Sequence, residues 1–207
     1  MQNMRGGWPL FAGITFTFAT GWVGLIVLPH LQLDGLSPAK EDGSTQIYPK
    51  PLEGMALMGR AVYVSEGCLY CHSQQVRPEG FGTDIARGWG DRRTVPRDYL
   101  YDDPILLGSM RTGPDLANIG SRQSDDAWHL LHLYNPLVTS PDSIMPPFGY
   151  LFESRRIVGE RSYDALPLKN EWAPPDGFEV IPTDRAKALV AYLKAQNRTF
   201  PLPEAAR

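Results

Sequence analysis

Residues 67–72 of the chain read GCLYCH, and they contain both cysteines of the 207-residue sequence. Cys68 and Cys71 are separated by two residues, and His72 follows the second cysteine directly. Cysteines at this spacing can form a disulfide, supply half of a zinc site, act as a redox couple or attach a prosthetic group. The residues on either side of the motif distinguish these alternatives.

Residues 53–66, which run directly into the motif, carry apolar side chains at helical spacing, among them Met55, Met58 and Val62. This pattern predicts an amphipathic helix in which the two methionines pack into the core. Gly67 fits the position just past the C-terminus of such a helix. A thioredoxin-like redox couple would instead follow a strand within a βαβ pattern, which this sequence does not show.

A structural zinc site requires four ligands, and His129 and His132 on a predicted helix could supply the two that the cysteines lack. A disulfide explains neither the spacing nor His72. In C-x-x-C-H sequences both thiols bond covalently to a haem and the histidine is presented to the iron. The sequence therefore favours one covalent haem c on Cys68 and Cys71, with His72 as an axial ligand and zinc as the alternative.

A second axial ligand is expected downstream, on an extended segment that can lie against the other face of the haem. Met145 in DSIMPPF fits, because the two prolines that follow keep this segment out of a helix. Histidine and methionine together make a six-coordinate electron-transfer iron with a raised potential. Met110, His129 and His132 are the rival ligands. No catalytic residue is expected, because the sequence shows no Ser-His-Asp set, paired carboxylates or phosphate loop.

The N-terminal residues 8–28, WPLFAGITFTFATGWVGLIVL, carry no charge. As a helix they would be about 31 Å long at about 1.5 Å per residue, which matches the hydrocarbon core of a bilayer. A cleaved signal peptide is the alternative, but the apolar run is long and no small-residue cleavage site follows it. We expect residues 1–33 to be a membrane anchor. Arg5 indicates a cytoplasmic N-terminus, with the rest of the chain outside the cytoplasm.

The remaining chain is expected to form a linker over residues 34–52 and one haem-binding domain over residues 53–200. Further helices are predicted at 124–136 and at 182–197, the latter capped by Thr183. Two long loops, 73–112 and 146–182, separate the predicted helices, and no β-alternation extends beyond a few residues. The net charge of −3 with no basic block makes nucleic acid an unsuitable partner.

In order, these features resemble a class I cytochrome c domain: a helix, GCLYCH, GPDLANIG, a helix, MPPF and a C-terminal helix. The resemblance covers residues 53–74, 113–149 and 183–197, and it implies a mainly α fold of short helices and long loops around haem. It also implies that Pro114 places its carbonyl oxygen on the δ nitrogen of His72. The two long loops exceed those of small family members, which indicates contacts with partners.

The segments VYVSEGCLYCHSQQVRPE, DRRTVPRDYLYDDPILLGSMRTGPDLANIGSR and YNPLVTSPDSIMPPF, behind one N-terminal membrane helix, resemble the mono-haem cytochrome c subunit of cbb3-type cytochrome c oxidases. The resemblance implies a non-catalytic redox subunit of a respiratory oxidase in the bacterial inner membrane, with its haem domain in the periplasm. Electrons would arrive from a di-haem cytochrome c subunit and leave to a haem-copper catalytic subunit, which reduces O2 to water. The haem c subunit of a nitric oxide reductase and a free membrane-anchored cytochrome c carrier are the alternatives.

Three further residues are candidates for contacts with the haem or its propionates: Arg111, Arg122 and Trp89. The alternative for each is a solvated position in a loop.

Overall fold

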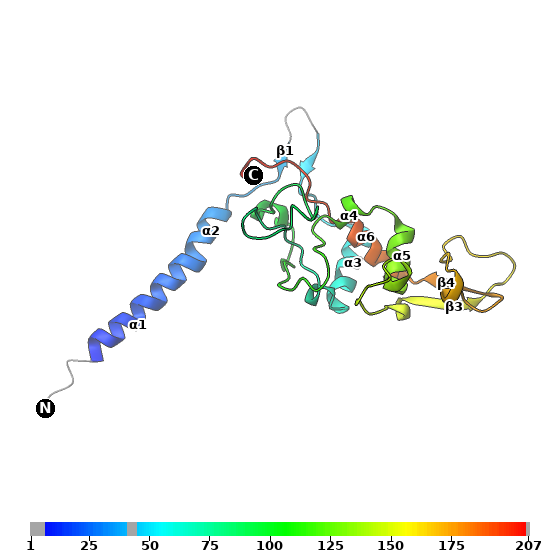
Figure 1. The fold of residues 1–207 in the computed structure, drawn as a ribbon. Coiled ribbons are helices and arrows are strands. Elements are labelled where there is room, and N and C mark those ends of the chain that lie inside the picture. The colour runs from blue at the N-terminus through cyan, green and yellow to red at the C-terminus, as the bar shows by residue number, and fades with distance from the viewer. Residues whose placement is uncertain (1–6, 41–44, 206–207) are drawn as a thin grey trace. The chain divides into compact units, whose positions relative to one another are not determined.

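The computed structural model describes residues 7–40 and 45–205 and divides the chain into two compact units, Met1–Pro38 and Ala39–Arg207. In the first unit, α1 (Gly7–Trp22), a π-helical segment (Val23–Val27) and α2 (Leu28–Leu33) form one continuous helix (Figure 1). The helix Gly7–Leu33 is 27 residues long and apolar enough to cross a membrane, and none of its described residues is buried. It extends five residues beyond the predicted end at residue 28.

The centre of the second unit is the packing of α3 (Gly54–Ser65) against α6 (Asp184–Ala195). The helices approach closely because Gly59 has no side chain: a Cβ atom there would lie 1.8 Å from the carbonyl oxygen of Ala188. The rings of Tyr63 and Tyr192 meet beside this contact, with centroids 5.2 Å apart. The two predicted helices that flank the domain therefore form its core.

The predicted face of α6 is confirmed. Thr183 caps the helix by accepting a hydrogen bond from the amide of Ala186, and the buried side chains include Ala186, Leu189, Val190 and Leu193. The predicted face of α3 is confirmed at Val62, which is buried, and wrong at Met55 and Met58, which are 47% and 62% exposed. Hydrophobic periodicity alone selected the methionines, whereas the close approach to α6 buries the side of the helix that carries Gly59.

Two more helices pack near the core: α4 (Ile119–Arg122) and α5 (Asp126–Tyr134), both in contact with α6. The N-cap of α5 is Asp125, whose side chain accepts a hydrogen bond from the amide of Ala127. Six 3-10 turns complete the helical elements described: Cys68–Tyr70, Pro96–Tyr99, Pro136–Val138, Gly149–Leu151, Asn170–Trp172 and Pro203–Ala205. The prediction of a mainly α fold is confirmed.

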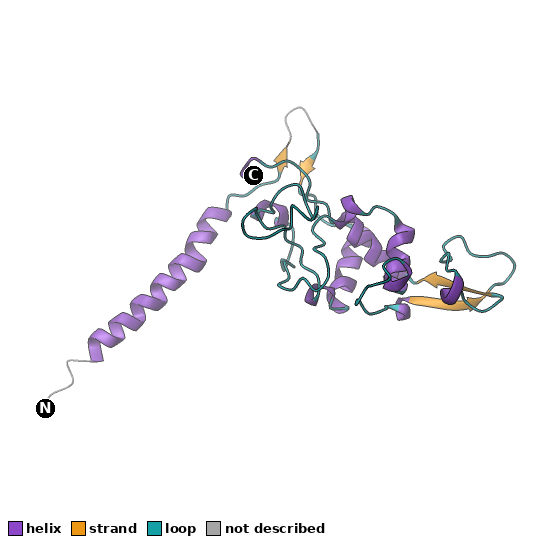
Figure 2. Cartoon of the chain, in the orientation of Figure 1, coloured by secondary structure: helices purple, strands orange, loops and turns teal. Residues whose placement is uncertain are grey.

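Short strands occur where the sequence predicted only loops (Figure 2). β1 (Ala39–Lys40) pairs with β2 (Ile47–Tyr48) inside the stretch expected to be a linker, so part of that linker belongs to the second unit. β3 (Phe152–Arg156) pairs antiparallel with β4 (Phe178–Pro182) inside the second long loop. Only the first residue of β3 is buried, which is why its sequence lacks the alternation of a half-buried strand.

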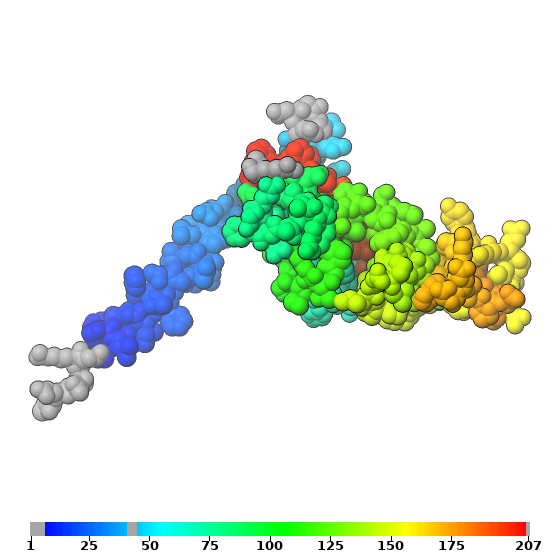
Figure 3. All heavy atoms as spheres, viewed as in Figure 1, coloured from blue at the N-terminus to red at the C-terminus, as the bar shows by residue number. Residues whose placement is uncertain are grey.

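The first long loop, residues 73–112, is ordered although one short 3-10 turn, Pro96–Tyr99, is its only described helical element. In the space-filling view its atoms form a compact mass against the rest of the second unit (Figure 3). Buried ion pairs hold it: Arg92 Nη2 lies 2.7 Å from Asp98 Oδ1, and Arg198 Nη2 lies 3.1 Å from Asp102 Oδ2. The loop is therefore part of the folded domain that carries the GCLYCH motif.

Candidate functional site

The GCLYCH motif forms one tight turn at the end of α3. Gly67 has φ of +71°, a left-handed conformation that a residue with a side chain rarely adopts, and it redirects the chain out of the helix. The amides of Cys71 and His72 then donate to the carbonyl of Cys68, at 3.2 and 3.0 Å. Both thiols and the imidazole are thereby presented by five consecutive residues.

The imidazole of His72 is oriented by a backbone carbonyl 42 residues away. Its Nδ1 lies 2.7 Å from the carbonyl oxygen of Pro114. A carbonyl can only accept, so Nδ1 carries the proton and Nε2 keeps a lone pair. Burial lowers the pKa of His72 below its ordinary value of 6.5, although the Pro114 carbonyl acts in the opposite direction. This arrangement favours a neutral imidazole with Nε2 able to bind a metal.

Gly113 makes this contact possible. A Cβ atom at Gly113 would lie 2.3 Å from Cε1 of His72 and 2.7 Å from Nδ1, well inside van der Waals contact. The Gly113 amide also donates to the carbonyl of Cys71 at 2.9 Å, which joins the two segments beside the ring. The glycine before Pro114 therefore leaves the space that the imidazole occupies.

Met145 and Cys68 belong to the same apolar surroundings. Both are partly buried and pack against the main hydrophobic cluster, as do Leu69 and Leu116. The buried members of that cluster come from the helices α3, α4, α5 and α6, from the first and second long loops, and from the strands β3 and β4. The thiol-bearing turn and Met145 therefore pack against the same apolar cluster.

The cysteines do not form a disulfide, and Cys71 is exposed. Burial raises the pKa of the Cys68 thiol to about 12. A redox couple needs a thiolate at neutral pH, so this environment disfavours thioredoxin-like chemistry.

The rival ligands are placed differently. Met110 is 55% exposed in the first long loop. His129 is buried, with Nε2 2.9 Å from the carbonyl of Gln123, and His132 has Nδ1 2.6 Å from the hydroxyl of Thr139. Over the described ranges 7–40 and 45–205, no group of three or more His, Cys, Asp or Glu side chains could hold a metal ion. The zinc alternative therefore finds no support in the described part of the chain.

These features together fit a covalently held haem. Two thiols and an imidazole with an available nitrogen lie on one turn, an apolar cluster adjoins them, and a methionine thioether packs against the same cluster. Cys68, Cys71, His72 and Met145 could hold such a group, and its chemistry would be one-electron transfer.

The three further candidates have protein partners. Arg111 forms an ion pair with Asp84, and its side chain is only 17% exposed. Arg122 donates to the carbonyl of Asp115. Trp89 is buried, and the Arg111 guanidinium lies over its ring, 5.7 Å from the centroid. The interpretation of Arg111 and Trp89 as solvated loop residues is therefore wrong.

Asp84 and Asp115 are not among the predicted site residues, although both side chains are fully buried beside this site. Acidic residues in a polar loop gave no sign of burial. The available signal was closeness in sequence: Asp115 directly follows Pro114, and Arg111 precedes both residues within the same five-residue stretch.

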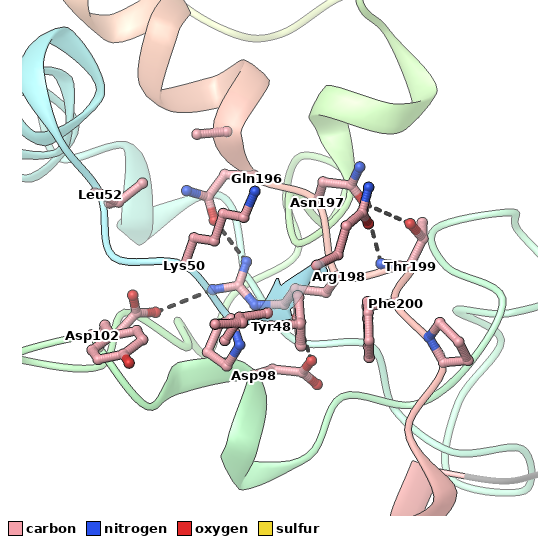
Figure 4. A pocket seen from close by; sticks show the side chains of 16 residues that line it. Tyr48, Lys50, Leu52, Asp98, Asp102, Gln196, Asn197, Arg198, Thr199 and Phe200 are labelled. Carbon is pink, nitrogen blue, oxygen red and sulfur yellow. Dashed lines mark hydrogen bonds and ion pairs between the residues drawn. The ribbon is translucent and has the colours of Figure 1, made fainter. Parts of the chain in front are cut away.

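A separate pocket of about 460 Å3 lies between residues 46–52 and 195–201 (Figure 4). Arg198 occupies its centre and donates to Asp102 Oδ2 and to Gln196 Oε1, while Tyr48 donates to Asp98. The described residues that line it include no cysteine, histidine or methionine. Because its central charge is already paired within the protein, we assign it to the packing of the domain.

A family model described as "Cytochrome C oxidase, mono-heme subunit/FixO" matches residues 14–169. The match spans most of the chain, including residues 14–33 of the apolar helix, the GCLYCH turn, Pro114 and Met145. No curated protein matches the chain.

Proposed function

The chain belongs to the FixO family of mono-haem cytochrome c oxidase subunits, and from this premise we propose that it relays electrons within the oxidase through one covalently bound haem c. Cys68 and Cys71 form thioether bonds to the haem. His72 and Met145 would supply the two side-chain ligands of its iron. The observation that carries the proposal is the hydrogen bond between His72 Nδ1 and the Pro114 carbonyl, which leaves Nε2 as the metal-binding atom.

The residues of this chain hold and shield the haem but take no part in oxygen chemistry. The Pro114 carbonyl keeps the imidazole in one tautomer and one orientation. The apolar cluster excludes water, and thioether ligation favours ferrous iron, so the potential is raised. No acid, base or nucleophile is required for electron transfer, and this chain is a non-catalytic redox subunit.

Within the complex, electrons arrive from a di-haem cytochrome c subunit and leave to a haem-copper catalytic subunit, where O2 is reduced to water. The apolar helix Gly7–Leu33 anchors the chain in the bacterial inner membrane, and the second unit faces the periplasm. This assignment rests on the family membership and on the resemblance of the motif segments to cbb3-type oxidases.

The test is an anaerobic reduced-minus-oxidised spectrum of the purified membrane complex, combined with a metal count. We expect a c-type haem spectrum that survives acid-acetone extraction in this chain, copper in the complex and O2 reduction. Nitric oxide reduction by a complex without copper would identify a nitric oxide reductase instead. An isolated chain that exchanges electrons with soluble partners and copurifies with no catalytic subunit would identify a free carrier.

A further inference from the structure

A balanced group of four buried or partly buried charges lies in the first long loop and at its end. Asp84 and Asp115 have fully buried side chains, and Arg111 lies between them, with Nη2 2.9 Å from Asp84 Oδ2 and 3.9 Å from Asp115 Oδ2. Arg77 completes the group, with Nη2 3.0 Å from Asp84 Oδ1. Buried carboxylates are costly without cationic partners, so removing one arginine changes the whole arrangement.

The group holds the backbone that immediately follows His72. Arg111 Nε donates to the Ser73 hydroxyl at 2.8 Å, and Arg111 Nη2 donates to the Gln75 carbonyl at 2.5 Å. The Ser73 hydroxyl donates in turn to Asp115 Oδ2 at 2.6 Å, and the same oxygen accepts from the Gln75 amide at 2.8 Å. Ser73 follows His72 directly, so Arg111 contacts the neighbour of the imidazole.

The same contacts hold the backbone that carries Pro114. Asp115 follows Pro114 directly, and its other oxygen accepts from the Ala117 amide at 2.8 Å. The Ser73–Asp115 hydrogen bond therefore joins the same two segments as the His72–Pro114 hydrogen bond, one residue further along each segment. A fixed Ser73–Asp115 hydrogen bond therefore restrains the geometry of the His72–Pro114 hydrogen bond.

We propose that Arg111 is a positioning residue for His72, acting through Ser73 and Asp115 to maintain the hydrogen bond between the imidazole and the Pro114 carbonyl. The first long loop, which supplies both Arg111 and its anchor Asp84, is then a clamp on the histidine side of the haem. The inference rests on the proposed function. It also explains why the Arg111 guanidinium faces Ser73, Gln75 and Asp84, groups of this chain.

The physical consequence concerns the electron density on the iron. A hydrogen bond from Nδ1 makes the imidazole a stronger donor through Nε2, and stronger donation stabilises ferric iron. Loosening the clamp lengthens or misaligns this hydrogen bond and raises the midpoint potential.

The experiment compares Arg111→Lys and Ser73→Ala in the purified, haem-loaded complex. Lysine keeps the charge but cannot form the branched set of contacts of the guanidinium, and Ser73→Ala deletes only the hydroxyl between Arg111 and Asp115. Both variants should retain covalent haem, shift the midpoint potential upward in a spectroelectrochemical titration, and change the electron paramagnetic resonance spectrum of the ferric haem. If Arg111→Lys fails to assemble, Ser73→Ala provides the same readout.

The matched control is Arg92→Lys. Arg92 also forms a buried ion pair in the same loop, with Asp98 at 2.7 Å, but forms no hydrogen bond or ion pair with Ser73 or Asp115. It should reduce thermal stability without moving the potential. Unchanged potential and resonance spectrum in the assembled test variants, or an equal shift in Arg92→Lys, would overturn the positioning role. Absence of covalent haem from the parent chain would instead refute the proposed function.

Discussion

The His72 ring is oriented by a hydrogen bond to the Pro114 carbonyl and occupies space that is free only because Gly113 has no side chain. The hydrogen bond to Pro114 is 2.7 Å long, and the nearest approach of an added Cβ at Gly113 would be 2.3 Å from the ring. A contact that short cannot be relieved without moving the imidazole or the backbone. The geometry of this single side chain therefore depends on two adjacent residues in a different segment.

We predict that Gly113→Ala displaces the His72 ring and weakens its bond to the haem iron. The ferric and ferrous absorption spectra should show a loss of the six-coordinate form, and thermal stability should fall, by about 1–3 kcal/mol for an overpacked site. Gly149→Ala is the control, because its added Cβ would meet only the Tyr134 carbonyl oxygen, at 4.0 Å. Parent-like spectra and stability in Gly113→Ala would contradict the close contact.

For the second axial position, we predict that Met145→Ala leaves the haem covalently attached but lowers its potential and opens a coordination site. The physical reason is the loss of a soft thioether ligand that favours ferrous iron. Carbon monoxide binding to the reduced protein and a potentiometric titration measure both effects. Met110→Ala, at an exposed methionine, should behave as the parent does. An unchanged spectrum and potential in Met145→Ala would exclude this methionine as the ligand.

Among the elements, the β3–β4 pair is stabilised by a buried carboxylate. Glu179 is 2% exposed and accepts hydrogen bonds from Arg155 Nε at 2.9 Å and from the Ser162 amide at 2.7 Å. The Ser162 hydroxyl donates to it as well. Hydrogen bonds from the Ser162 hydroxyl and amide, followed by the contact with Arg155, lower the pKa of Glu179 from 4.5 to about 2.

This lowered pKa predicts an acid-sensitive strand pair. A carboxyl group whose pKa is depressed by folding contributes stability above its unfolded value, near 4.5, and that stability is lost as the pH falls towards 2. Hydrogen-exchange protection of residues 152–182, corrected for intrinsic rates, should therefore decrease across this window. Glu179→Gln should have weaker protection at neutral pH and little further loss in acid.

The control for this prediction is Glu153→Gln, which alters an exposed carboxylate on the same strand pair. In this variant, the hydrogen-exchange protection of residues 152–182 should depend on pH as it does in the parent. Protection that is insensitive to pH between 4.5 and 2 in the parent would show that Glu179 does not stabilise the pair.

Considered as a whole, the chain consists of an apolar helix and a folded domain joined near residue 38. A helix of 27 residues is about 40 Å long at 1.5 Å per residue, enough to span a bilayer with some tilt. The proposed single span by this helix would place the two ends of the chain on opposite sides of the membrane.

We predict that an alkaline phosphatase fused after residue 207 is active in a Gram-negative bacterium, because this enzyme becomes active only outside the cytoplasm. A green fluorescent protein fused after residue 207 and exported with the domain should show no fluorescence. The fusion at the N-terminus is the control and should report the opposite side. An inactive phosphatase together with a fluorescent C-terminal fusion would reverse the proposed orientation.

Much of this protein follows from local sequence patterns. A charge-free run predicts an apolar helix, Thr183 and the apolar spacing after it predict α6, and GCLYCH predicts a turn that presents two thiols and an imidazole. These features are local because each depends on residues within a few turns of one another, where hydrogen bonding and hydrophobic period decide the conformation.

The remaining features depend on residues distant in sequence, which meet only when the chain folds. The close approach of α3 to Ala188 determines which face of α3 is buried. His72 and Pro114 are 42 residues apart in sequence and come into contact only when the first long loop is folded. The burial of Asp84 and Asp115 could not be read from their polar neighbours, because Asp84 pairs with Arg111 at the far end of the loop and Asp115 accepts a hydrogen bond from Ser73, 42 residues away. Local pattern thus specifies the ligand-bearing turn, and long-range packing specifies the groups that orient it.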